Sequence, residues 1–109
     1  MAFDNHLADR IRTVLGKRPR LVEKKMFGGL AFLLNGNMCC GVHKESLIVR
    51  LDPADTDAAL AEPGAKVFDI TGRPMKGWIL VDPSGVDTAV LLRKWLERAD
   101  RYVSSLPAK

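Results

Sequence analysis

Long hydrophobic runs are absent from this sequence. No stretch approaches the roughly 20 consecutive apolar residues that a membrane-spanning helix needs. The first residues, Met1 to Arg12, mix charged and apolar side chains and so lack the apolar core of a secretory signal. We therefore expect a cytoplasmic protein that does not engage a membrane.

Cysteine is scarce, since the chain has only Cys39 and Cys40, which are adjacent. Neighbouring residues of a strand point to opposite faces, so an ordinary disulfide between them would be strained. The pair therefore excludes a disulfide framework and indicates a reducing compartment. If residues 37–43 form a regular strand, Cys40 shares a face with Met38 and Val42, and Cys39 lies on the other face. A buried core thiol is the simplest interpretation of Cys40.

Motifs of known catalytic and metal sites are also missing. Cys39 and His43 would share a strand face but stand about 13 Å apart, too far to share a metal ion or to form a nucleophile–base pair. The sequence contains no Gly-x-Ser-x-Gly, no Gly-x-Gly-x-x-Gly and no P-loop spacing. We therefore expect a protein that is not an enzyme and that has no catalytic residues, no metal and no cofactor.

The positive charge of the chain is concentrated at its beginning. The formal net charge is +4, and residues 1–25 hold seven bases against three acids, whereas the remainder has ten of each. Such a cluster attracts phosphate backbones or acidic protein surfaces. A solvated helix end with its loop explains the charges equally well, because few aromatic residues are interleaved with them. The candidate nucleic-acid contacts are Lys17, Arg18, Arg20, Lys24 and Lys25.

Apolar residues recur at helical spacing near both ends of the chain. The first such segment runs from Phe3 to Leu15 and is followed by Gly16, a residue suited to a left-handed helix cap. The last begins at Ser84, which forms a capping-box-like pattern with Asp87, and its apolar stripe extends to Val103. We expect a helix in each segment.

Strand patterns fill the region between these helices. Asn35-Gly36 supplies the positive backbone angles that a tight hairpin turn requires. Four closely spaced strands are expected to connect as an antiparallel meander, over residues 21–27, 29–34, 37–43 and 46–51. A short middle helix should begin at Asp52-Pro53. Two further strands over 66–70 and 78–81 complete the pattern, and whether they join the main sheet stays open.

These elements together predict one α+β domain over residues 1–109. An antiparallel sheet, built from the four-strand meander and two further strands, would be flanked by the N-terminal, middle and C-terminal helices. Arg50 stands out because it lies in an otherwise apolar strand. It either faces solvent at an edge or pairs with Asp69 or Asp82, since a buried guanidinium normally requires a partner.

Several segments of the sequence together resemble a known family. They are KKMFGGLAFLLNGNMCCGV from Lys24, LIVRL from Leu47, GRPMKGWILV from Gly72, and the terminal SLPAK. On these motifs the chain resembles, over nearly its whole length, the N-terminal domain of the TfoX/Sxy family. The resemblance implies a small α+β domain with an antiparallel sheet and flanking helices. It also implies a link to the regulation of bacterial DNA uptake, although the second, helical domain of the founding members does not follow here, so a stand-alone domain is expected.

Two segments that carry the resemblance lack an evident core role, Gly28-Gly29 and the loop from Arg73 to Gly77. The glycines either allow a close backbone approach at a strand corner or take part in function. If the two segments meet, the candidate functional surface consists of Gly28, Gly29, Arg73 and Lys76.

The function that we expect is that of a small non-catalytic regulatory or protein-interaction domain. Its partner would be another protein, or a second copy bound as a homodimer through a sheet edge or the last helix. The alternative is a nucleic-acid-associated protein that uses the basic N-terminal quarter.

Overall fold

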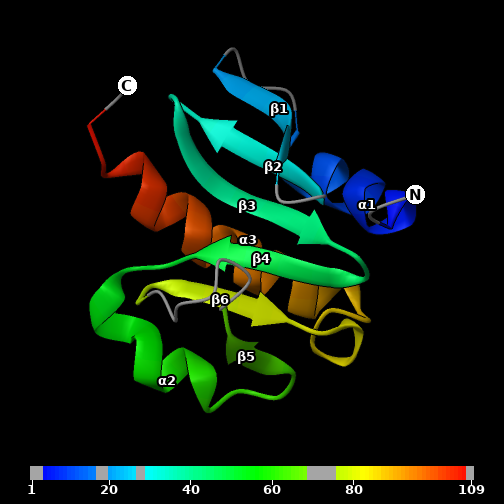
Figure 1. Cartoon of the computed structure of the whole chain (residues 1–109), viewed down its shortest axis with the longest axis vertical. Helices are drawn as coiled ribbons and strands as arrows, with labels where there is room; N and C mark the ends of the chain where they lie inside the picture. Colours follow the sequence, from blue (N-terminus) through cyan, green and yellow to red (C-terminus); the bar gives the residue numbers. More distant parts are fainter. Residues whose placement is uncertain (1–3, 17–19, 27–28, 69–75, 108–109) are drawn as a thin grey trace.

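The chain forms a six-stranded antiparallel sheet with helices packed against it (Figure 1). The computed structural model describes residues 4–16, 20–26, 29–68 and 76–107. The strands lie in the order β1-β2-β3-β4-β6-β5, and α3 runs behind the sheet in Figure 1. The expected α+β class, with three flanking helices, is confirmed. In chain order the elements are α1 (Asn5–Leu15), β1 (Leu21–Met26), β2 (Gly29–Leu34), β3 (Asn37–His43), β4 (Ser46–Arg50), η1 (Pro53–Asp55), α2 (Thr56–Leu60), β5 (Ala65–Val67), β6 (Trp78–Val81), η2 (Pro83–Gly85) and α3 (Ala89–Ser104).

The first four strands form the expected meander. Asn35 and Gly36 adopt φ angles of 55° and 83° between β2 and β3, as a type I′ hairpin turn requires. The next turn places Lys44 at a φ of 54° between β3 and β4. Local turn chemistry therefore accounts for the pairing of these neighbouring strands.

The last two strands extend the same sheet. β6 pairs with β4, and β5 pairs with β6 at the far edge. The strand expected over residues 66–70 is described as the shorter β5, Ala65–Val67, and residues 69 and 70 lie outside the described ranges. After β4 the chain runs through α2 to β5, which forms the edge of the sheet. It then returns to form β6 in the position between β4 and β5.

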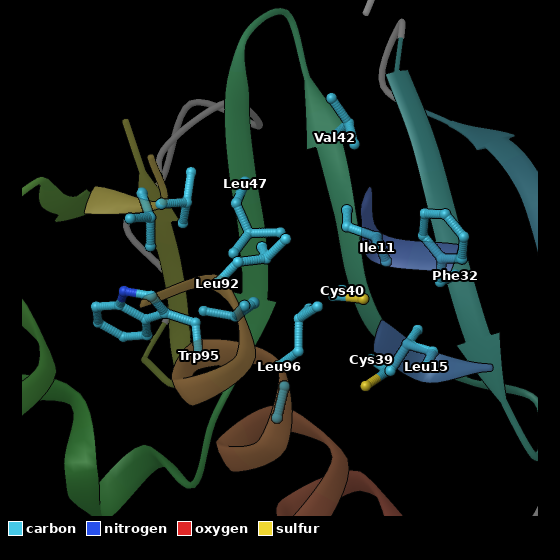
Figure 2. Close-up of a cluster of buried hydrophobic side chains, with 14 of the residues drawn as sticks. Ile11, Leu15, Phe32, Cys39, Cys40, Val42, Leu47, Leu92, Trp95 and Leu96 are labelled. Carbon is cyan, nitrogen blue, oxygen red and sulfur yellow. The ribbon is translucent and has the colours of Figure 1, made fainter. Parts of the chain in front are cut away.

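The sheet has one face covered by helices and one without a described helix. On the covered face, α1 and α3 pack against alternate residues of the strands (Figure 2). That core includes Ile11, Leu15, Phe32, Cys39, Cys40, Val42, Leu47, Leu92, Trp95 and Leu96. On the opposite face lies a smaller apolar cluster, consisting of Ala31, Met38, Ile48 and Phe68, with Leu33, Trp78 and Leu80 partly buried beside it.

A bulge in β3 changes the expected orientation of the cysteines. Cys40 lies opposite Phe32 and Met38 lies opposite Leu33, so the register shifts by one residue at Cys39. As a result both cysteines enter the core under the helices, whereas Met38 belongs to the opposite face. The prediction that Cys40 shares a face with Met38 is therefore wrong, because the alternation of a regular strand does not hold across a bulge.

The last helix begins later than the capping pattern predicts. The Oγ1 atom of Thr88 accepts a hydrogen bond from the backbone N–H of Leu91 and caps α3. Ser84 lies instead in η2, where its hydroxyl donates to the Asp82 carboxylate at 2.5 Å. Gly85 is packed so closely that an added Cβ would come within 2.5 Å of the Val81 side chain. Tight packing of this turn thus delays the helix.

Candidate interaction surfaces

The two thiols form a buried pair rather than an exposed reactive group. Cys39 is 1% exposed and Cys40 is fully buried. A hydrogen bond with the Cys39 thiol, together with burial, raises the pKa of Cys40 well above its ordinary value. The Cys40 thiol therefore stays protonated at neutral pH and is a poor nucleophile.

The described residues form neither a metal-ligand cluster nor a membrane-spanning helix. Within residues 4–16, 20–26, 29–68 and 76–107, no three His, Cys, Asp or Glu side chains are placed to hold a metal ion. In these ranges no helix is long and apolar enough to cross a membrane.

The basic N-terminal quarter is only partly available for contacts. Arg12 donates hydrogen bonds to Glu23 at 2.6 and 2.7 Å and to Asp9 at 2.5 Å. The hydrogen bond from Arg12 holds the pKa of Glu23 below its ordinary value. Arg10 donates to the carbonyl oxygen of Val86 at 2.7 Å. Two of the cations in this quarter are thus engaged within the fold.

The candidate nucleic-acid contacts do not form one continuous patch where they are described. Arg20, Lys24 and Lys25 are exposed, and Lys17 and Arg18 lie outside the described residues. Lys24 pairs with Ala31 and Lys25 with Leu30, so the two lysines point to opposite faces of the sheet.

Gly29 has a structural role at the start of β2. A Cβ atom added to it would lie 2.0 Å from the carbonyl oxygen of Val42 and 3.1 Å from its carbonyl carbon. Only a residue without a side chain allows β2 and β3 to approach this closely. The close-approach interpretation therefore holds for Gly29, and Gly28 lies outside the described residues.

The other half of the expected surface lies elsewhere in the fold. Lys76 is exposed and precedes Gly77, whose carbonyl oxygen accepts a hydrogen bond from the Leu51 N–H at 2.6 Å. This contact is beyond the end of β4, whereas Gly29 lies beside the end of β3. Because β3 and β4 are antiparallel, Gly29 and Lys76 lie toward opposite ends of the sheet. Arg73 lies outside the described residues.

Lys76 instead lies near a cation–aromatic cluster. The Arg50 guanidinium carbon is 5.3 Å from the centre of the Trp78 ring and 5.9 Å from that of Tyr102. Arg50 and Trp78 are register partners on β4 and β6, and Tyr102 comes from the last turns of α3. The cluster therefore joins two motifs of the family resemblance, LIVRL and RPMKGW. Tyr102 was not singled out from the sequence, because no local pattern connects it to Arg50.

An acidic partner for Arg50 is not present among the described residues. Asp82, one of the two partners considered, has its carboxylate 3.6 Å from the Lys66 ammonium group and accepts a hydrogen bond from Ser84. Asp69, the other, lies outside the described residues. The alternative that Arg50 faces solvent at an edge is wrong, because β4 lies between β3 and β6. Arg50 is half-buried, with two aromatic rings in place of a carboxylate.

The outer face of α3 forms a shallow groove. The groove has a volume of about 520 Å³ and runs along Ala89, Val90, Arg93, Lys94, Glu97, Arg98 and Arg101. Val90 is 78% exposed there. Arg93 and Arg101 make no ion pair within the described part of the chain, whereas Lys94 and Arg98 share the Glu62 carboxylate at 2.6 Å each. The surface is therefore basic and has an apolar edge.

The Glu62 network makes stability depend on pH. Partial burial would raise the pKa of Glu62, but hydrogen bonds from Lys94 and Arg98 outweigh it and lower the pKa. A carboxyl whose pKa is lower in the folded state stabilises the fold above its unfolded-state pKa, and this contribution disappears as pH falls through the folded-state pKa. We expect Glu62→Gln to reduce the free energy of unfolding by about 1 kcal/mol at neutral pH, and by progressively less in acid.

Urea denaturation of the unmodified protein and of Glu62→Gln, from neutral pH into the acid range, measures this difference in the free energy of unfolding. Glu97→Gln serves as the matched control, because Glu97 is exposed on α3 and forms no ion pair in the described ranges. A Glu62→Gln difference that does not change with pH would contradict the network.

A comparison with known protein families identifies the family of this chain. Residues 13–101 match the family model of the TfoX N-terminal domain, and this range includes the strands of the sheet, Gly29, Arg50 and the greater part of α3. Comparisons with curated proteins and with solved structures give no match. Because the family match covers most of the 109 residues, the chain belongs to the TfoX N-terminal domain family.

Proposed function

We propose that this chain is a non-catalytic regulatory domain that binds an acidic surface of another protein through the outer face of α3. The observation that carries the proposal is the combination of exposed Val90 with Arg93, which lies in the same groove and makes no ion pair with a described residue. An apolar contact surrounded by arginines is typical of a protein interface, where arginine supplies charge and contact area together. Membership of the TfoX N-terminal domain family supports the regulatory character.

A protein partner suits this groove better than a nucleic acid does. Glu97 lies in the middle of the groove and would repel a phosphate backbone, whereas an acidic protein surface can present a donor to it. A second copy bound symmetrically through this face is disfavoured, because a two-fold interface would bring like charges together. The N-terminal basic residues favour nucleic acid less than their number suggests, since Arg12 is neutralised by Asp9 and Glu23.

The test is retention of a partner by purified variants. The domain is immobilised and incubated with nuclease-treated lysate of the source cells at low and moderate salt. We expect Val90→Asp and Arg93→Glu each to reduce retention of the bound protein at least about tenfold, because each places an acidic group against an acidic surface. The double variant Lys24→Glu/Lys25→Glu, on β1, should retain that protein normally.

The opposite pattern would overturn the proposal. In that pattern the retained material is lost on nuclease treatment, and its binding weakens steeply with salt. Binding also depends on Lys24 and Lys25 rather than on Val90. Such behaviour would identify a nucleic-acid-binding protein instead. Circular dichroism of each variant confirms that α3 is folded, which is expected because Val90 and Arg93 are both exposed.

A further inference from the structure

Arg50 is held in place by aromatic rings. Its guanidinium carbon lies 5.3 Å from the centre of the Trp78 ring and 5.9 Å from that of the Tyr102 ring. The π-electrons of the two rings attract the cation, but the rings do not supply the oxygen acceptors that its N–H groups require. The side chain is partly buried, so the arrangement fixes the position of the charge without neutralising it.

The hydrogen-bond donors of Arg50 have no protein acceptor in the described ranges. A guanidinium group has five N–H donors in a rigid planar fork. The carboxylate of Asp82 lies beyond the other end of β6, where Val81 pairs with Leu47, and is occupied by Lys66 and Ser84. A fixed fork with unfilled donors is the geometry by which arginine binds carboxylate and phosphate in a bidentate manner.

Further positive charge lies at the same end of the sheet. Lys76 is exposed and stands next to Gly77, which is hydrogen-bonded to the residue that follows Arg50. Arg50 and Lys76 together suit a group with a charge of about −2 better than a single carboxylate, and a phosphate monoester carries about −1.5 to −2 at neutral pH.

Acidic residues restrict where such an anion fits. Asp52 and Asp55 line a hollow of about 320 Å³ on the Tyr102 side of the cluster, together with Arg98 and Arg101. An anion in that hollow would meet two carboxylates. The favourable side is therefore the one that adjoins Trp78, away from the hollow that Asp52 and Asp55 line.

We propose that Arg50, supported by Lys76, binds a phosphate monoester group at this end of the sheet. Recognition is directed at the phosphate rather than at a nucleobase, because the Trp78 ring already has Arg50 over it and Phe68 beside it, with ring centres 5.7 Å apart. This site is separate from the α3 groove and does not depend on its partner.

Titration with inorganic phosphate tests the site directly. Nuclear magnetic resonance follows the Arg50 Nε–H and the Trp78 indole N–H while chloride keeps the ionic strength constant. We expect both signals to shift saturably, and Arg50→Lys to weaken binding at least about tenfold, because lysine keeps the charge but loses the fork. Lys76→Gln should weaken binding several-fold. Arg93→Lys is the matched control and should bind phosphate normally, since Arg93 is exposed near the start of α3 and forms no ion pair in the described part of the chain.

Shifts that grow linearly without saturating, or equal weakening by Arg93→Lys and Arg50→Lys, would overturn the proposal, since both indicate general screening of positive charge. A second titration compares glycerol phosphate with a peptide that contains phosphoserine and with the same peptide unphosphorylated. Tighter binding of the phosphopeptide identifies a phosphorylated protein as the source, whereas equal binding of both esters identifies a small-molecule phosphate. Equal binding of phosphorylated and unphosphorylated peptides would count against the site.

Discussion

Replacing Gly29 with alanine is expected to lower the free energy of unfolding by about 3 kcal/mol. The new methyl group would lie 2.0 Å from the carbonyl oxygen of Val42, which is backbone and cannot rotate away. β2 and β3 would have to separate at this end, which weakens their hydrogen bonds and exposes the core beneath them. Chemical denaturation followed by circular dichroism measures the loss.

Gly16→Ala provides the matched control for this prediction. Gly16 ends α1 at a φ of 70°, and an added Cβ would have no neighbour within 4 Å. Its cost should be about 2 kcal/mol, the strain alone of a backbone at φ 70° and ψ −167°, a region that is essentially restricted to glycine. If Gly29→Ala proved no more harmful than Gly16→Ala, the close approach of β2 and β3 would be refuted, and the glycine motif would need a functional explanation.

Truncation of Trp95 to alanine is expected to cost about 4 kcal/mol of folding free energy. Trp95 is 1% exposed and packs between α3 and the sheet, as Figure 2 shows. Its removal leaves a cavity that the flanking strands cannot fill. It also removes the ring over which the Arg98 guanidinium carbon lies at 4.7 Å and the Lys94 nitrogen at 5.5 Å. Thermal or urea denaturation detects a change of this size without ambiguity.

Val90→Ala on the same helix should change stability by less than about 0.5 kcal/mol, because Val90 is 78% exposed. The contrast separates the inner face of α3, which holds the fold together, from the outer face, which is free for a partner. A loss below about 1 kcal/mol for Trp95→Ala would mean that α3 does not pack on the sheet through this residue.

Local chemistry explains the part of the fold that could be predicted. The meander follows from short connections such as Asn35-Gly36, where a two-residue turn with positive φ angles permits only a hairpin. The helical segment formed by η1 and α2 likewise begins where Asp52 accepts a hydrogen bond from the Ala54 N–H at 3.0 Å, as the Asp-Pro pattern predicts. In both cases the determining residues are adjacent in the chain.

The errors in the prediction arose where packing between distant residues intervenes. The bulge at Cys39 depends on the match between β2 and β3 rather than on the residues of β3 alone. The capping pattern at Ser84 was overridden because Gly85 packs against Val81 and the Pro63 carbonyl. Local propensity is a weak guide at such positions, since tertiary contacts contribute more free energy than a cap does.

For the candidate sites, too, the sequence indicated individual residues, whereas their neighbours in space depend on the tertiary structure. The sequence identified Gly29 and Lys76 as residues in need of explanation, but the structure places them toward opposite ends of the sheet. Arg50 stood out because a cation is unusual in an apolar strand. Its neighbours Trp78 and Tyr102 could not be named, because they come from a strand and a helix whose positions relative to β4 are set only when the sheet closes on α3.

By itself, the sequence determined the class of the fold, the meander and the membership of a family, because turn residues, periodicity and motifs act over short distances along the chain. Only the tertiary structure decided the position of β6 between β4 and β5, the side on which both thiols lie, and the meeting of Arg50 with two aromatic rings. These features depend on burial and on contacts between segments far apart in sequence, and such contacts are chosen by the free energy of the whole packed core.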